Sequence, residues 1–360
     1  MKKTVYLFLM LLSLALLSNC THVTFSSPLV KTTGELPNLI APGGQTLKLE
    51  IVDNRPAPEI YGGGLALIDS GVFIAYGVDP NISLGQYLEK TAAETCKTLG
   101  TDVGSGAATL KITVSEFWID MYRFSGWSPM NCIGYGSLTI DSRKDGAPVS
   151  PTRSYKVAYY ENTTPAWSMD EVAREAMSRI YSQAIWETLG KTLLETRSPV
   201  LDPNGLEKLL QMIETETDDR AAREMIFWLG LVGRDDPKVK EKLLQIFRNT
   251  REQRRRQAAV EAVGMLGIQE ARQDIVDILA GTRKVGYWSN DDAEEVFYLI
   301  KALANLGENN LQEYIPKQDF RARKKVEDLV GFLNTGKIPE LHPNAKPLFE
   351  EVKAEAKKKN

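Results

Sequence analysis

The segment Phe227-Trp228-Leu229-Gly230-Leu231-Val232-Gly233 recurs twice in altered form, as Glu261-Ala262-Val263-Gly264-Met265-Leu266-Gly267 and as Lys301-Ala302-Leu303-Ala304-Asn305-Leu306-Gly307. In each copy a large apolar residue precedes a small one, an apolar residue follows, and glycine closes the segment. The closing glycines are 34 and 40 residues apart. An amphipathic pattern follows each of the first two copies. Pairs of helices at a nearly fixed period indicate repeats that stack side by side, with Gly230, Gly264 and Ala304 at the close contacts.

These positions resemble HEAT repeats of the short bacterial kind, and the resemblance covers residues 204–335. It implies an all-α solenoid with a concave surface that binds protein. The longer third interval contains Gly286-Tyr287-Trp288-Ser289-Asn290, which predicts an inserted loop. Residues 336–360 are rich in charge and read as a C-terminal tail.

The chain before the repeats has a different period. Apolar and polar residues alternate in several segments, which predicts strands at 46–52, within 65–76 (one or two strands), and at 110–118, 136–141 and 155–159. Two capping boxes, Ser83-Leu84-Gly85-Gln86 and Ser168-Met169-Asp170-Glu171, open helices that end near residues 99 and 195. Residues 46–196 are therefore expected to form an α+β domain, an antiparallel sheet with two covering helices. Residues 197–203 read as the linker to the solenoid.

The N-terminus has the pattern of an export signal. Two lysines precede an apolar stretch of about 13 residues, which is shorter than the roughly 20 that span a bilayer. Leu17-Ser18-Asn19-Cys20 resembles the bacterial lipobox, although Asn19 departs from the usual Gly, Ala or Ser. The resemblance implies a lipoprotein signal peptide at 1–19 and a tether at 20–45. The alternative is an ordinary signal peptide with Cys20 as an unmodified thiol.

A lipobox implies covalent lipid on Cys20, namely a diacylglycerol on sulfur and an acyl chain such as palmitate on the new amino group. No other cofactor is expected. The lipid would attach the chain to the membrane, and Thr21 in place of an aspartate favours the outer membrane, facing the periplasm. The rest of the chain has no other long apolar segment.

The first domain resembles the YajG-like outer-membrane lipoproteins. The features that carry the resemblance are the lipobox, the strand ending in Val52-Asp53-Asn54-Arg55, the glycine turn 62–64, the helix closing at Gly100, and the strands that begin at Ala108, Gly136 and Tyr155. The family implies an envelope location and no enzymatic activity, so it provides no catalytic residues.

The residues themselves give little sign of catalysis. The two histidines, His22 and His342, are far apart in sequence. They suggest neither a zinc site nor a general base that activates a serine or cysteine nucleophile. The acidic cluster Asp291, Asp292, Glu294 and Glu295 lies at the start of a predicted helix, where negative charge suits the helix dipole. We therefore expect no enzyme and no metal site; a hydrolase using these carboxylates is the minor alternative.

Two features are candidates for binding. Arg251, Arg254 and Arg255 can share one helix face and present a basic ridge to an anionic partner; the alternative is a solvated face paired with nearby acids.

The aromatic residues Tyr122, Phe124 and Trp127 suggest either a ligand-holding loop or packing at the sheet edge. A net charge of −3 argues against a nucleic-acid partner.

Cys96 and Cys132 are the two cysteines left once Cys20 is lipidated. They read either as a disulfide, which an oxidising envelope would permit, or as two buried thiols.

Taken together, these patterns predict a lipid-anchored envelope lipoprotein that is not an enzyme and that acts as a scaffold or adaptor, binding an unknown envelope protein through its repeats. The alternative is a periplasmic carrier whose α+β domain binds a lipid or glycan in a cavity near Phe117, Trp118 or Trp127.

Overall fold

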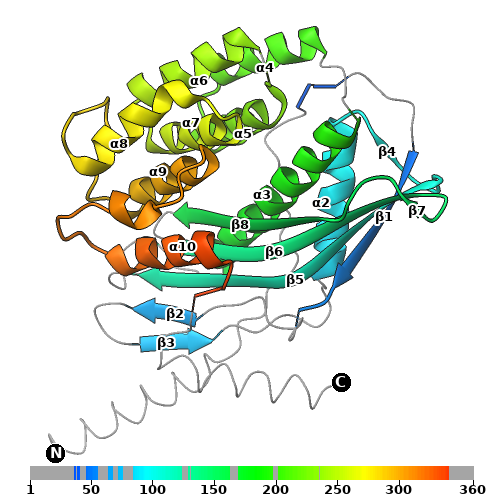
Figure 1. Cartoon of the computed structure of the whole chain (residues 1–360), viewed down its shortest axis with the longest axis horizontal. Coiled ribbons are helices and arrows are strands. Elements are labelled where there is room, and N and C mark those ends of the chain that lie inside the picture. The colour runs from blue at the N-terminus through cyan, green and yellow to red at the C-terminus, as the bar shows by residue number, and fades with distance from the viewer. Residues whose placement is uncertain are drawn as a thin grey trace, which may run out of the picture.

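Figure 1 shows the computed structural model of the chain. The structure describes residues 36–37, 39–40, 46–55, 64–67, 72–75, 84–123, 129, 131–162, 169–197, 202–234 and 236–339. The proposed signal peptide with Cys20, both histidines, Phe124, Trp127 and most of the charged tail lie outside these residues.

Among the described residues, eight strands form one sheet in the first half of the chain. Its longest strand is β5 (Ala108–Arg123), which pairs along one side with β1 (Thr46–Asp53) and β2 (Gly64–Leu67). On its other side β5 pairs with β6 (Asn131–Lys144), which in turn pairs with β8 (Arg153–Asn162). Short strands complete the sheet: β3 (Val72–Ala75), β4 (Asp102–Val103) and β7 (Ala147–Pro148). The predicted strands are confirmed, and the segment 65–76 contains two of them.

The prediction of an antiparallel sheet was wrong, because the sheet is mixed. Strand β6 runs antiparallel to both of its neighbours, β5 and β8, but β1 runs parallel to β5, with Leu47 opposite Ala108 and Asp53 opposite Val114. The helix α2 (Leu84–Thr98) lies between these strands in sequence. It carries the chain back to the end where β1 began, so β5 starts in the same direction as β1.

Helices α2 and α3 (Met169–Arg197) pack together on one face of the sheet, as the sequence predicted. Phe117 of β5 lies on this face, with its ring 4.5 Å from that of Tyr181 in α3. Two glycines of β6 make room for this packing. A Cβ atom at Gly134 would lie 2.2 Å from the Ile180 side chain, and one at Gly136 would lie 2.7 Å from the Phe117 ring.

The second half of the chain is helical. Its elements are α4 (Pro203–Thr215), α5 (Asp219–Val232), α6 (Pro237–Asn249), α7 (Gln253–Met265), η1 (Gln269–Ala271), α8 (Arg272–Ala280), α9 (Ala293–Asn305), η2 (Leu311–Tyr314) and α10 (Arg323–Thr335). The repeated segments form α5, α7 and α9, which lie side by side. A Cβ atom at Gly230 would lie 2.5 Å from the Cβ of Ala262, and one at Gly264 would lie 2.9 Å from the Cα of Ala302. The small residues therefore set the spacing of these helices, as predicted.

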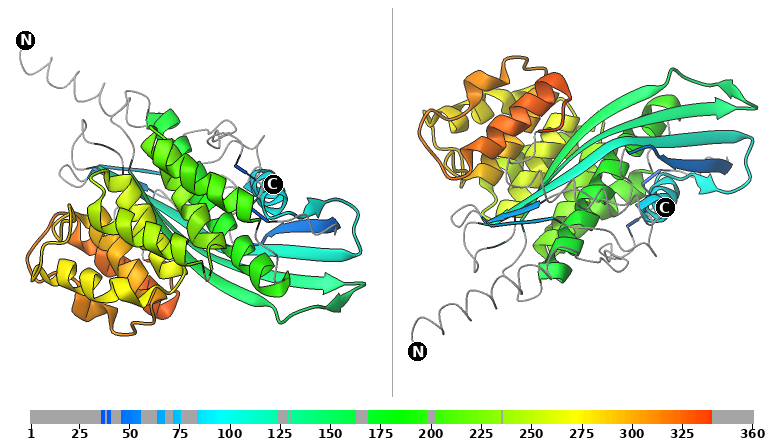
Figure 2. Two further views of the ribbon diagram at one scale, coloured as in Figure 1. Left: turned by 90° about the horizontal axis from the view of Figure 1, so that it is seen from above. Right: turned by 90° about the horizontal axis from the view of Figure 1, so that it is seen from below.

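The helical region packs on the second face and the edge of the sheet (Figure 2). On that face, the ring of Phe332 in α10 contacts Tyr135 of β6, and Lys325 of α10 pairs with Asp120 of β5. At the edge strand β8, the Tyr160 ring lies 5.5 Å from Phe297 of α9. Most residues of helices α5, α7 and α9 are buried. The inner face of the repeats, which was expected to be a concave binding surface, is thus covered by the chain's own sheet and α3.

Across the part of the chain that the structure describes, no helix combines the length and the apolar character needed to cross a bilayer.

Candidate functional site

The junction between β8 and the inner helices is lined with buried charged groups. Arg223 of α5 lies at its centre, and its Nη1 is 2.7 Å from Oε1 of Glu161 on β8. Its Nη2 donates to the hydroxyl of Tyr298 on α9, at 2.6 Å. The Tyr298 hydroxyl donates in turn to the backbone carbonyl of Tyr160, at 2.5 Å. Since all four residues are buried, these bonds connect the sheet to the helical region where water does not compete.

A second buried group lies nearby, between α3, α7 and α9. Lys301 of α9 pairs with Glu261 of α7 at 2.5 Å and approaches Glu187 of α3 at 3.7 Å. Glu187 also pairs with Lys191 and accepts a hydrogen bond from the Tyr159 hydroxyl. Lys301 therefore connects three helices through two carboxylates.

The carboxyl groups in the junction differ strongly in pKa. Burial by itself would raise the pKa of Glu187, but Lys191 and Lys301 lower it to about 2. Burial raises the pKa of Glu261 despite its pairing with Lys301. At Glu294, burial raises the pKa to about 8 although Arg223 opposes the shift, and Asp292 raises it further. Glu294 is therefore largely protonated at neutral pH, whereas Glu187 is ionised.

The acidic cluster at the start of α9 is divided between structural roles. The Asp292 side chain accepts from the backbone N–H groups of Glu294 and Glu295, which makes it the N-cap of α9. Glu295 pairs with Arg256 and accepts from the backbone N–H of Ser289. The acids lie at the start of a helix, as predicted, and capping accounts for Asp292 and ion pairing for Glu295.

The three arginines of the predicted basic ridge have separate environments. Arg255 pairs with Asp219 at 2.9 Å and donates to the carbonyl of Glu216, so it holds α7 against α5. Arg254 donates to the carbonyl of Asn162 at the end of β8, at 3.1 Å. Arg251 is exposed and lies against the ring of Tyr287, whose hydroxyl accepts from its Nε at 2.7 Å. Arg254 and Arg255 are thus half-buried and bonded to groups of the chain itself, whereas Arg251 is exposed.

The predicted inserted loop connects α8 to α9 and is tightly held. Trp288 is buried against Phe247, and its indole N–H donates to the Phe247 carbonyl at 2.9 Å. Gly286 has φ +54°, and a Cβ atom there would lie 2.1 Å from the carbonyl oxygen of Arg248. Between these two fixed points Tyr287 points outward with 47% of its surface exposed. The loop therefore presents an aromatic ring on a rigid support.

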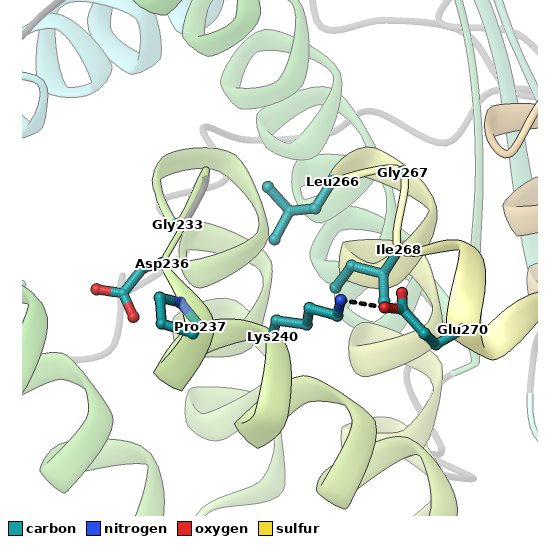
Figure 3. A pocket seen from close by; sticks show the side chains of 8 residues that line it. All are labelled: Gly233, Asp236, Pro237, Lys240, Leu266, Gly267, Ile268 and Glu270. Carbon is teal, nitrogen blue, oxygen red and sulfur yellow. Dashed lines mark hydrogen bonds and ion pairs between the residues drawn. The ribbon is translucent and has the colours of Figure 1, made fainter.

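A groove of about 360 Å³ lies between the turn that follows α5 and the turn that follows α7 (Figure 3). Its lining includes Asp236, Lys240 and Glu270. Lys240 pairs with Glu270, and Asp236 accepts from the backbone N–H groups of Lys238 and Val239 as the N-cap of α6. The charged groups of the groove are thus engaged with one another or with a helix end, and the groove by itself indicates no ligand.

Cys96 and Cys132 are both buried thiols, and no disulfide joins them among the described residues. The carbonyl of Cys96 accepts from Thr101, shortly before β5 begins, whereas Cys132 is opposite Met121 near the end of β5. About 40 Å of strand separates these two points, far beyond the roughly 7 Å between Cα atoms that a disulfide allows. The interpretation as two buried thiols describes this structure.

Phe117 is packed against Tyr181 and the β6 glycines, so the core is filled at the place where the carrier hypothesis expected a cavity. Trp118 is half-buried, and Trp127 lies outside the described residues. This packing weakens the ligand-carrier alternative.

Sequence reasoning missed the roles of Arg223, Tyr298 and Lys301; a signal was present for Lys301 alone. The repeat interval of 34 residues aligns Phe227 with Glu261, and the interval of 40 aligns Glu261 with Lys301. Oppositely charged residues at equivalent positions of an otherwise apolar helix face indicate a buried ion pair between neighbouring repeats.

No protein-family model and no curated protein matches the chain. Several solved structures are similar to about half of it. One is a DUF330-family protein from Xanthomonas campestris, with 20% identity, 49% of this chain and 98% of that chain covered, and a TM-score of 0.31. A minor lipoprotein from Acinetobacter baumannii has 9% identity, coverage of 44% and 98%, and a TM-score of 0.26. A putative neuraminyllactose-binding hemagglutinin homolog from Helicobacter pylori has 9% identity, coverage of 50% and 97%, and a TM-score of 0.25.

Proposed function

We propose that this protein is a lipid-anchored envelope lipoprotein, held in the outer membrane through Cys20 and facing the periplasm, that acts as a non-enzymatic scaffold. Its HEAT-like repeats bind a partner protein. The support for the anchor is the lipobox at residues 17–20, and the support for the scaffold role is the helical region described above.

The observation that carries the scaffold proposal is the pair formed by Arg251 and Tyr287. The guanidinium carbon of Arg251 lies 5.2 Å from the centre of the Tyr287 ring, and both residues are exposed. Tyrosine and arginine are among the residues that contribute most to protein interfaces. Because Trp288 and Gly286 fix the loop, little conformational entropy is lost when a partner covers this surface.

The inner face of the repeats is covered, so the partner surface is on the outside of the helical region. Arg251 makes the contact in this proposal. Arg254 and Arg255 position the start of α7 through Asn162 and Asp219, which keeps Arg251 beside Tyr287.

Photo-crosslinking in intact cells tests the proposal. A photoreactive phenylalanine analogue replaces Tyr287 in one strain and Val149 in another. Val149 is a matched control because it is 54% exposed but lies just after β7, away from the loop. We expect a discrete protein crosslink from position 287 that is absent from position 149 and weaker in an Arg251→Ala background. The same products from both positions, or none from position 287, would contradict the proposal.

A further inference from the structure

Three arginines from three different helices meet at the last residues of β8. Arg223 of α5 lies 2.7 Å from Glu161, and Arg179 of α3 lies 3.9 Å from the other oxygen of the same carboxylate. Arg254 of α7 donates to the carbonyl of the next residue, Asn162. The three side chains therefore surround one short stretch of strand.

Positive charge exceeds negative charge at this place. Glu161 is the carboxylate that pairs with Arg223 and Arg179, whereas no carboxylate of the described residues lies within ion-pair distance of Arg254. Glu294 lies close enough to interact with Arg223 and Arg254, but its pKa of about 8 leaves it largely uncharged at neutral pH. Burial lowers the pKa of Arg254, and the nearby arginines Arg220, Arg223 and Arg179 lower it further, while Glu161 opposes the shift.

The surrounding backbone also favours an anion. Helix α7 begins at Gln253, directly before Arg254, and its N-cap residue Glu252 makes no side-chain capping bond. The first N–H groups of this 13-residue helix and its dipole therefore favour negative charge. Arg223, which is 95% buried as a side chain, has its Nε without a partner in the described part of the chain.

The cluster is accessible from solvent at one side. Arg254 and Asn162 are both only half-buried, unlike Glu161 and Arg223. One nitrogen of the Arg254 guanidinium donates to Asn162, and the planar group has further N–H donors suited to two oxygens of one anion.

We propose that Arg254, together with Arg223 and Arg179, forms a binding site for a phosphate group at the end of β8. The phosphate belongs either to a free ion or to the headgroup of a phospholipid, and both present the same tetrahedral oxyanion. The site does not depend on the scaffold function, because it lies at Asn162 rather than at Tyr287.

Calorimetric titration of the full chain with inorganic phosphate in chloride buffer tests the site. We compare wild type with Arg254→Gln and with Arg143→Gln. Arg143 is a matched control, since it is an exposed arginine of β6 that is paired with Asp141. Loss of one charge-assisted contact should weaken phosphate binding about tenfold or more in Arg254→Gln and leave Arg143→Gln unchanged. A melting curve of each variant without phosphate shows whether it is folded.

Binding to phospholipid vesicles distinguishes a lipid headgroup from a free phosphate ion as the ligand. Phosphatidylglycerol vesicles, compared with phosphatidylcholine vesicles that carry no net charge, should retain wild type more strongly than Arg254→Gln if the headgroup is the ligand. Saturable binding of either probe that depends on Arg254 supports the site. Equal binding by wild type and Arg254→Gln, or no binding of either probe by folded wild type, overturns it. The crosslink from position 287 is a separate measurement. Failure of the phosphate-binding experiment therefore does not contradict the scaffold proposal.

Discussion

Arg223 of α5 and Glu161 of β8 form a buried ion pair across the junction between the sheet and the helical region, with side chains 5% and 2% exposed. Each has a further polar contact, Arg223 with Tyr298 and Glu161 with Gln183. The pair is thus hydrogen-bonded on both sides, which is the arrangement that offsets the cost of removing two charges from water.

Replacing Arg223 with methionine should destabilise the protein by about 3–5 kcal/mol, because Glu161 would remain buried without its main partner. Urea denaturation measures the change. The control is Lys238→Ala, which removes a highly exposed ion pair with Glu207 and should cost no more than about 0.5 kcal/mol. A double variant, Arg223→Met with Glu161→Leu, should recover most of the loss. A single variant as stable as wild type would show that the pair does not hold the junction.

Ionisation of Glu294 should lower the free energy of unfolding as the pH rises. Its folded pKa of about 8 lies above the ordinary value of 4.5, so the folded protein retains a proton that the unfolded chain releases. The stability gained in this way is complete below about pH 4.5 and is lost as the pH rises through 8.

The variant Glu294→Gln cannot release this proton. Compared with wild type it should gain stability between pH 5 and pH 9, by a change of about 4 kcal/mol, since each pKa unit corresponds to about 1.4 kcal/mol. Denaturation curves at several pH values provide the measurement. Parallel pH profiles for the two proteins would mean that Glu294 titrates normally.

Two glycine substitutions separate close packing from helix propensity. Gly264→Ala places a Cβ atom 2.9 Å from Ala302 and should destabilise by about 1–3 kcal/mol, because α7 and α9 must move apart. Gly331→Ala in α10 meets nothing within 4 Å and should stabilise by up to about 1 kcal/mol. Melting temperatures of the two variants should therefore shift in opposite directions. A stabilising effect of Gly264→Ala would contradict the close approach.

Lipidation of Cys20 makes a prediction that is independent of the fold. Mass spectrometry of the mature protein should find Cys20 as the first residue, carrying a diacylglycerol and an acyl chain. The variant Cys20→Ser should leave the membrane fraction, because each buried methylene contributes about 0.8 kcal/mol of membrane affinity. A mature N-terminus elsewhere, with an unmodified thiol at Cys20, would favour the ordinary signal peptide.

Local pattern was sufficient for the elements themselves. The alternation around Ile112 predicted β5, and the small residues Gly230 and Gly264 predicted where helices approach. Both depend on neighbours a few residues away, or on a repeat interval, and are therefore visible in the sequence. The basic ridge was a different kind of inference. It assumed that Arg254 and Arg255 face solvent, whereas their partners Asn162 and Asp219 lie 92 and 36 residues away in the chain.

The sequence by itself determined the strands, the repeated helices and the positions at which those helices make close contact, because side-chain period and residue size act locally. Only the tertiary structure decided that β1 runs parallel to β5 and that the inner face of α5, α7 and α9 is covered by β8 and α3. It also decided that Arg223 meets Glu161. These relationships depend on the direction in which a crossover returns and on which surfaces exclude water, and both are set by the whole chain rather than by any single segment.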